Sequence, residues 1–395
     1  MKKLLIILLL PLFMFNCFAF EWGGLFKENA KATVGNLEDI IMFDTMAIRQ
    51  SNSLALWMTT PFDESSNWYI SGQMSYKYNL DFTVLGRTFT NIVDVDLLKV
   101  AGVIPVGVNN ITLSAGRFFV ADSTAKIFCQ NTDGFLIKYS SLFMNISMYA
   151  GYTGLLNGYT VTMLNSAGFE DSDNKVFLKV YKKSRSYVPV TASITFPSLF
   201  LNQAVGLQAM AFFDVNKEND ALLYIKANRY YGTLFMEGPI YGPVFYSMNT
   251  TFGSLDFKNV MNMSMLEVSV FSKFVSTKFR VEYASGKHAC FEPFVGFTSY
   301  TAYNSPAYPQ YSGLLMPSAD LIFTFKNISV YLNGKYVLSA MTDKIESEGI
   351  DASLRTYINI FSDLQLEVGA GLYYDIHNSG SDNFYNANIG LSLAF

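Results

Sequence analysis

The sequence ends on Asn-Ala-Asn-Ile-Gly-Leu-Ser-Leu-Ala-Phe, residues 386–395, and no polar tail follows the last aromatic residue. In this stretch the apolar side chains of Ile389, Leu391 and Leu393 alternate with small or polar ones. A period of two is the pattern of a β-strand with one apolar face. Because exposed termini are usually polar and frayed, we expect this strand to pack against another element.

The same alternation recurs along the chain. It is found in 68–76, 142–148, 205–211, 221–227, 328–336, 350–360 and 364–374. These segments approach the length that a tilted membrane-spanning strand requires. The pattern predicts about 18 strands, between roughly 16 and 20, and an even number is expected for a bacterial single-chain barrel.

Composition favours a membrane protein without membrane helices. Charged residues make up only 15% of the chain and aromatic residues 16%, whereas a soluble domain carries about 25% charged residues. After residue 19, no apolar run reaches the ~18 residues of a membrane helix. Since backbone groups in lipid must be bonded internally, a closed, antiparallel, up-and-down transmembrane β-barrel is the remaining solution.

The first 19 residues have the pattern of a secretory signal peptide. Lys2 and Lys3 precede an apolar run from Leu4 to Phe15, and Cys17-Phe18-Ala19 forms a small-x-small cleavage site. We therefore predict a single barrel domain over 20–395. The alternative is that Cys17 is lipidated, but the large residues before it argue against this.

Processing also sets the charge and the cysteine content. Removing Lys2 and Lys3 from the 28 basic residues leaves 26 against 32 acidic ones, a net charge of −6. This balance argues against a nucleic-acid partner. Only Cys129 and Cys290 remain, and whether they pair is left open. Two cysteines in a chain of this length form no disulfide framework.

The connections between the strands alternate in length. Lys326-Asn327 and Ser362-Asp363 are tight turns, whereas longer polar connections are predicted at 153–174, 284–290, 301–317, 339–349 and 376–383. In outer-membrane barrels the short turns lie at the periplasmic rim. A soluble β-sandwich would also alternate. The low charge, the signal peptide and the 35 Phe and 25 Tyr residues, which suit interfacial girdles, favour the barrel.

Two stretches resemble segments of known barrel families. Asn388, Gly390, Leu393 and Phe395 are similar to the C-terminal assembly signal of outer-membrane barrels, which implies recognition by the barrel-assembly machinery. Residues 114–141, with Gly116-Arg117 and Asp133-Gly134, loosely resemble porin-like and alginate-export-like barrels. That resemblance implies a transport barrel. Phe118 departs from the export pattern, so its substrate does not carry over.

The face of each strand that is not apolar should line the lumen. By parity the inward bases are Lys77, Lys138, Lys179, Lys226, Lys278, Arg280, Lys326, Lys335 and Arg355, and the inward acids are Asp214, Glu267, Glu282, Asp320, Asp351 and Glu367. A lumen with more bases than acids would favour anions or sugar acids. Equally, these charges could pair across strands and only keep the pore wet.

The predicted pore-lining residues are Lys278, Arg280, Glu282, Lys335, Arg355 and Glu367. Arg117 has the parity of Ile111 and Leu113, so either a bulge near Gly116 turns it inward or it snorkels at the rim. The loop residues Tyr300, Tyr303, Tyr308 and Tyr311 are candidates for a constriction or for stacking on a sugar. An ordinary surface loop would carry the same tyrosines.

Catalysis and metal binding have little support in the sequence. His377, Ser379 and Asp382 resemble the outer-membrane phospholipase arrangement, but they lie in a Gly/Asn/Asp-rich stretch without the Asn-Gly of that family. His288 and Cys290 alone are too few to ligate a metal. We predict neither an enzyme nor a cofactor.

The sequence therefore predicts an outer-membrane channel for small hydrophilic solutes, surrounded by outer-membrane lipid. The alternative is a barrel adhesin whose loops 153–174 and 301–317 bind host or neighbouring cells, and such a protein has no need of an open pore. The number of subunits stays open, a homo-oligomer included.

Overall fold

The computed structural model describes residues 20–35, 46–83, 86–161, 163–168, 176–178, 180–216, 226–288, 290–298, 300, 311–342, 344–376 and 383–395. Residues 1–19, the predicted signal peptide, lie outside these ranges. No helix in the described part of the chain is long and apolar enough to cross a membrane.

Eighteen strands form one sheet. They are β1 (Glu21–Val34), β2 (Ala47–Pro61), β3 (Trp68–Thr83), β4 (Gly86–Val106), β5 (Asn109–Ala121), β6 (Cys129–Ser140), β7 (Asn145–Tyr152), β10 (Tyr187–Phe200), β11 (Gln203–Asp214), β12 (Arg229–Tyr241), β13 (Val244–Leu255), β14 (Met261–Phe271), β15 (Val275–Ala284), β16 (Leu314–Phe325), β17 (Ile328–Ser339), β18 (Glu346–Asn359), β19 (Leu364–Asp375) and β20 (Phe384–Ala394). The short strands β8 (Val176–Leu178) and β9 (Tyr181–Lys182) pair only with each other in a second sheet.

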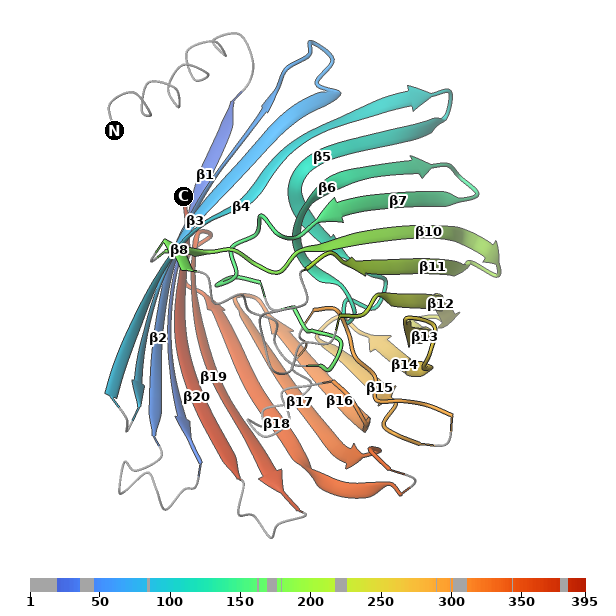
Figure 1. Cartoon of the computed structure of the whole chain (residues 1–395). Helices are drawn as coiled ribbons and strands as arrows, with labels where there is room; N and C mark the ends of the chain where they lie inside the picture. The colour runs from blue at the N-terminus through green and yellow to red at the C-terminus, as the bar shows by residue number, and fades with distance from the viewer. Residues whose placement is uncertain are drawn as a thin grey trace.

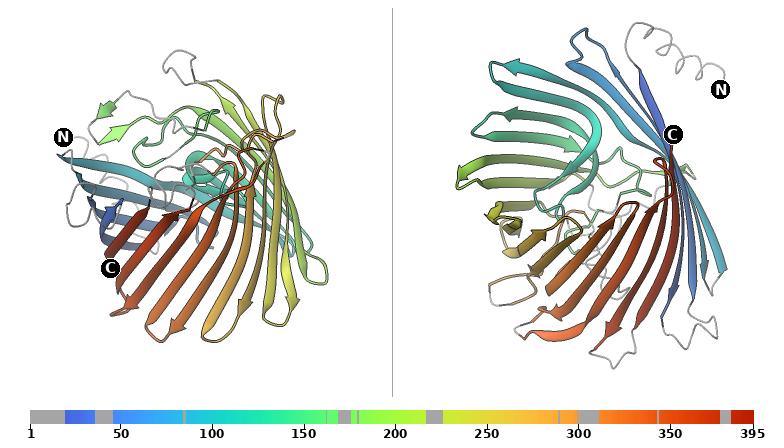
Figure 2. Two further views of the ribbon diagram at one scale, coloured as in Figure 1. Left: turned by 90° about the horizontal axis from the view of Figure 1, so that it is seen from below. Right: turned by 180° about the vertical axis from the view of Figure 1, so that it is seen from behind.

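The large sheet is a closed, antiparallel, up-and-down barrel. Consecutive strands pair throughout, β7 pairs with β10, and β1 pairs with β20 to complete the ring. The ring is visible in Figure 1 and from two other sides in Figure 2. This confirms the predicted fold and the predicted strand number. Closure leaves no strand edge to be paired where β1 meets β20.

The outer face of the barrel is apolar and open to its surroundings. Leu207 is 56% exposed, and Phe252 and Phe279 are exposed to a similar extent on their own strands. Their sequence neighbours point into the barrel, as the period of two requires. The alternation thus produces the apolar band that a membrane barrel presents to lipid.

Connections of two lengths mark the two rims. One rim carries tight turns, such as 107–108, 201–202, 242–243 and 326–327, together with the last residue, Phe395. The other rim carries the long connections, including 122–128, 153–186 and 285–313. The alternation of short and long connections is the one predicted for an outer-membrane barrel.

Three predicted segments lie at or beyond the ends of strands. Residues 221–225 of the predicted strand 221–227 lie outside the described residues; of the rest, 226–228 belong to no strand, and β12 begins at Arg229. The segment at 142–148 begins only at Asn145, because the hydroxyl of Ser141 closes a turn with Met144. The predicted loops 284–290 and 301–317 belong to one connection, 285–313.

The C-terminal strand closes the barrel through the residues of the assembly-like signal. The backbone amide of Gly24 donates to the Phe395 carbonyl at 2.7 Å, and the amide of Phe395 donates to the Gly24 carbonyl at 3.0 Å. The Phe395 ring lies so close to Gly24 that any side chain there would collide with it. Leu393 pairs with Phe26. Cys129 and Cys290 are both free thiols.

Candidate pore constriction

Three long connections at one rim turn into the barrel instead of away from it. Figure 1 and Figure 2 show the green connection after β7 crossing the interior of the ring of strands. Residues from 122–128, 153–186 and 285–313 are among the most buried of the protein, including Phe128, Met163 and Phe297. The lumen is therefore narrowed from within, at the level where these connections meet the wall.

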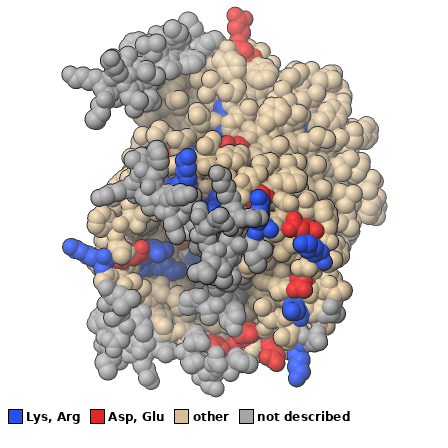
Figure 3. Space-filling model, in the orientation of Figure 1, with Lys and Arg blue, Asp and Glu red and all other residues tan. Residues whose placement is uncertain are grey.

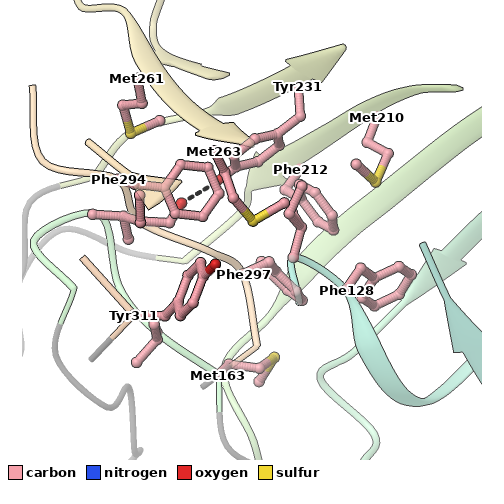
Figure 4. Packing of buried hydrophobic residues seen from close by; sticks show 14 of the residues in the cluster. Phe128, Met163, Met210, Phe212, Tyr231, Met261, Met263, Phe294, Phe297 and Tyr311 are labelled. Carbon is pink, nitrogen blue, oxygen red and sulfur yellow. Dashed lines mark hydrogen bonds between the residues drawn. The ribbon is translucent and has the colours of Figure 1, made fainter. Parts of the chain in front are cut away.

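An apolar cluster, here called the apolar plug, holds these connections against the inner wall of β5–β16. Ten of its members are labelled in Figure 4: Phe128, Met163, Met210, Phe212, Tyr231, Met261, Met263, Phe294, Phe297 and Tyr311. The Phe212 and Phe297 rings stack with their centroids 4.2 Å apart. Phe128 meets Phe212 edge-on at 5.3 Å. The inward face of β11 and its neighbours is apolar here, and the prediction of a polar inner face does not hold in this region.

Arg229 joins two of the connections at the centre of the plug. Its side chain is fully buried, with Nη1 donating to the Gly296 carbonyl at 2.9 Å and Nη2 donating to the Leu164 carbonyl at 2.5 Å. Its guanidinium carbon lies 5.0 Å from the ring centroid of Phe297 and 5.3 Å from that of Tyr187. Among the described residues, no carboxylate forms an ion pair with it. Carbonyls and ring faces thus hold this charge, as cation–π contacts allow.

The connection 122–128 is held in shape by hydrogen bonds between its backbone and the Asp122 side chain. One carboxylate oxygen of Asp122 accepts from the amides of Ile127 at 3.0 Å and Phe128 at 2.8 Å, and the other accepts from the amide of Thr124 at 2.8 Å. Such bonds from an Asp side chain to the backbone that follows it fix a turn. They hold Lys126 at the inner surface of the connection.

Lys126 forms a buried ion pair with a residue of the wall. Its Nζ lies 2.6 Å from Glu282 and 4.7 Å from the ring centroid of Tyr311, with Tyr300 nearly as near. Burial lowers the pKa of Lys126, and the Glu282 carboxylate opposes that shift. Burial and the same carboxylate raise the pKa of the Tyr311 hydroxyl well above its usual range. The lysine and the tyrosine act here as supports of the constriction.

From Glu282, ion pairs continue along the inner wall. Arg280 contacts Glu267 at 2.5 Å and Glu282 at 3.4 Å, and Lys278 reaches Glu267 at 3.6 Å. Asp320 lies 4.0 Å from Arg280. The predicted residues Lys278, Arg280 and Glu282 therefore do lie on the inner face of β15. Because acids compensate their charges, they are weaker candidates for attracting anions than their number suggests.

Another part of the wall, formed by β18–β20 and β1, carries two basic residues that line a cavity. They are Lys31 and Arg355, here called the wall pair. They lie in one row of paired residues across β1, β20, β19 and β18, in the order Lys31, Asn388, Gly369, Arg355. Together with Glu367 they line a cavity of about 200 Å³. In the part of the chain that the structure describes, neither base forms an ion pair. Figure 3 shows that charged side chains in this view are few in its upper right and more frequent in its lower half, within a mostly uncharged surface.

The remaining predicted residues fall in several places. Lys335 faces Asp351 in the register of β17 and β18, and Asn388 donates to Glu367 at 3.1 Å. Gly390 faces inward beside Asn29. Lys326 lies in a turn rather than on a strand. Tyr303, Tyr308, Lys179, His377, Ser379 and Asp382 lie outside the described residues.

Sequence reasoning missed Lys31, Lys126 and Arg229. The alternation around Lys31 would have placed it inward with Asn29, so a usable signal was present. Lys126 and Arg229 gave none, since their roles depend on connections folding inward. No cluster of metal-ligating side chains occurs among the described residues.

Comparison with known proteins agrees with the fold. No protein-family model matches the sequence, and no curated protein does. Three solved structures each match 95% of this chain and 98% of their own. They are OccK9 (OpdG) of Pseudomonas aeruginosa at a TM-score of 0.62 and 9% identity, OpdK of P. aeruginosa with vanillate at 0.56 and 9%, and OccAB4 of Acinetobacter baumannii at 0.57 and 10%. At such identities the likeness shows a shared barrel architecture.

Proposed function

We propose that the protein is an outer-membrane channel through which small hydrophilic solutes diffuse, with a preference for anions. The wall pair carries this proposal, because two bases without ion-pair partners face the open side of a constriction and attract negative solutes through a narrow, low-dielectric passage. Residues 1–19 direct export, and the C-terminal strand directs assembly by the barrel-assembly machinery. One of the solved relatives in fold was determined with vanillate, a small aromatic compound.

The direction of the long connections favours a channel over an adhesin. Met163 and Leu164, in one connection proposed for host contact, are buried in the plug, as is Phe297 before the second. Side chains that are buried inside the barrel cannot contact another cell. A narrowed but polar passage is what a selective channel requires.

Neutralising the wall pair tests the preference. We expect the double variant Lys31→Gln with Arg355→Gln to lower the anion-to-cation permeability ratio by roughly three- to tenfold, since two open charges at a constriction act at short range. The measurement is the reversal potential of purified protein in a planar bilayer under a salt gradient.

A matched double variant tests whether charges without an ion-pair partner matter more for selectivity than charges within an ion pair. Arg280→Gln with Glu267→Gln removes an ion pair at 2.5 Å without changing the net charge. Its reversal potential should stay close to that of the unmodified channel. If removing this pair shifts selectivity as strongly as removing the wall pair, the wall pair is not the selective element.

A further inference from the structure

The outer face of the barrel is hollowed across β10–β13, near the rim of long connections (Figure 1). The register places the outward side chains of these strands in rows, and one row on β10–β12 holds only small residues, Ala192, Ala209 and Gly232. The next row toward the short turns is bulky, with Ile194, Leu207 and Leu234. This step in side-chain size leaves a groove of about 530 Å³, here called the outer groove, which is lined among others by Ala192, Ala209, Ala211, Gly232, Phe252 and Phe257.

The outer groove is apolar and continuous with the lipid-facing band. Val190, Phe252 and Val260 line it and are all exposed. In a membrane barrel this face is surrounded by hydrocarbon, not by water. The volume lies within the ~300–1,000 Å³ of small-molecule sites, so the groove is large enough for a ligand. Its surroundings and its lining both call for an apolar occupant.

Gly232 lies in the floor of the outer groove, although nothing within the chain requires a glycine there. It is not among the residues with positive φ, and β12 pairs regularly with β11 and β13 at this point. A side chain at this position would meet no atom within 4 Å. Glycine weakens the interior of a strand, and it often marks a place where a ligand approaches closely. The space above Gly232 is therefore open to a molecule from outside the chain.

A strained turn holds an aromatic ring at the rim end of the outer groove. Phe257 has a φ of 57° and Asp256 a φ of 48°, a conformation that is unusual for a bulky side chain. Asn228 fixes the turn, because its amide donates to Oδ1 of Asp256 at 3.0 Å and its carbonyl accepts from the Asp256 amide at 2.9 Å. The Phe257 ring stacks on Tyr230 with the centroids 4.0 Å apart and is still 76% exposed. Such strain is found at ligand clamps.

The same turn carries a positive charge. Lys258 lies between Phe257 and Val260, which both line the outer groove, and its side chain is exposed. It forms no ion pair with any residue that the structure describes. A base at the membrane surface attracts anionic lipids. An apolar groove that ends at such a base matches a lipid with a long chain and a phosphate group.

We propose that the outer groove binds one acyl chain of an anionic, phosphate-bearing membrane lipid. The chain lies over Gly232 and against the Phe257 ring, and the phosphate lies near Lys258. The site is separate from the lumen. It covers the outside of the wall whose inner side carries Met210 and Tyr231 of the apolar plug.

Tryptophan fluorescence reports directly on the outer groove. Phe257→Trp keeps a ring next to Tyr230 and places a reporter at the end of the groove. In liposomes, we would compare its quenching by phosphatidylglycerol and by phosphatidylcholine that carry the same dibrominated chains. The signal of the unmodified protein, which contains Trp22, Trp57 and Trp68, is subtracted. Half-maximal quenching should need about three- to tenfold less of the anionic lipid, the effect expected of one base at the membrane surface.

Variants in the reporter background separate the chain from the phosphate. Gly232→Leu fills the groove with a side chain that meets no neighbour, so the barrel should fold while the reporter loses its preference and most of its quenching. Lys258→Gln should remove the preference but keep the maximal quenching. Gly334→Leu is the matched control, because this glycine of β17 is equally open, and it should change neither quantity. Each variant is first checked for heat-modifiable mobility, so that misfolding is recognised.

Three results would overturn the proposal. The first is equal quenching of the reporter by the two lipids, and the second is an unchanged preference after Gly232→Leu. The third is a reporter that neither lipid quenches, because a second copy of the barrel would then cover the outer groove. The measurement needs no ion current, so its failure is distinct from failure of the channel itself.

Discussion

Replacing Arg229 with methionine is expected to raise the conductance of the barrel roughly twofold or more and to make it noisy. The substitution leaves the Leu164 and Gly296 carbonyls without donors in the interior of the plug, at a cost of about 1–3 kcal/mol each. Loss of the buried charge offsets part of this cost. Both carbonyls belong to connections that fold into the barrel. Their loss of hydrogen bonds therefore weakens the packing of these connections against the wall, and the constriction opens more often. Single-channel recording of the purified protein measures the effect.

Two further variants make the test specific. Arg229→Lys retains the charge but offers a compact ammonium instead of a planar fork, so it should give an intermediate conductance. Arg87→Met, at the start of β4, removes the same kind of side chain far from the plug and should change nothing. A methionine variant with the unmodified conductance and noise would mean that Arg229 does not hold the constriction closed.

Loss of Phe395 is expected to remove most of the protein from the outer membrane. Its backbone forms both hydrogen bonds to Gly24 that end the β1–β20 pairing, and its ring covers Gly24. Deletion, or Phe395→Lys, removes the apolar ring from the seam where the barrel closes and places a charge there. The level of heat-modifiable protein in isolated outer membranes measures the outcome.

A second change at the same seam should have the same effect. Gly24→Val would force a side chain into the space of the Phe395 ring. By contrast, Phe361→Lys alters an exposed aromatic residue in the turn before β19, away from the seam, and should leave levels unchanged. Normal levels after deletion of Phe395 would show that the terminal residue neither closes nor directs the barrel.

The regular strands were predictable, because each side chain's direction follows from a period of two. Lys278, Arg280 and Glu282 were predicted to face inward for this reason; ion pairs join them on β15, and their part in the pore stays a prediction. Arg117 could not be placed, because its partners come from distant parts of the chain: it donates to the Leu155 carbonyl of the connection after β7 and lies 3.7 Å from Asp94 of β4. No local pattern reports such contacts.

The constriction was not predictable from alternation. Phe212 and Tyr231 point inward although they are aromatic, because connections distant in sequence cover them. A rule that assigns apolar faces to lipid fails wherever the lumen is filled. Arg229 likewise gains its partners from residues 164 and 296. Such contacts form only because long connections fold into the barrel. That direction depends on packing between segments far apart in the sequence, so no local pattern predicts it.

Current through the purified barrel in a planar bilayer is the most direct test of the channel. Under a salt gradient, we predict stepwise ion currents whose reversal potential lies toward the equilibrium potential of the anion. We expect the wall pair to set that sign and the apolar plug to limit the step size. A folded, heat-modifiable barrel that passes no current at any applied voltage would contradict the account.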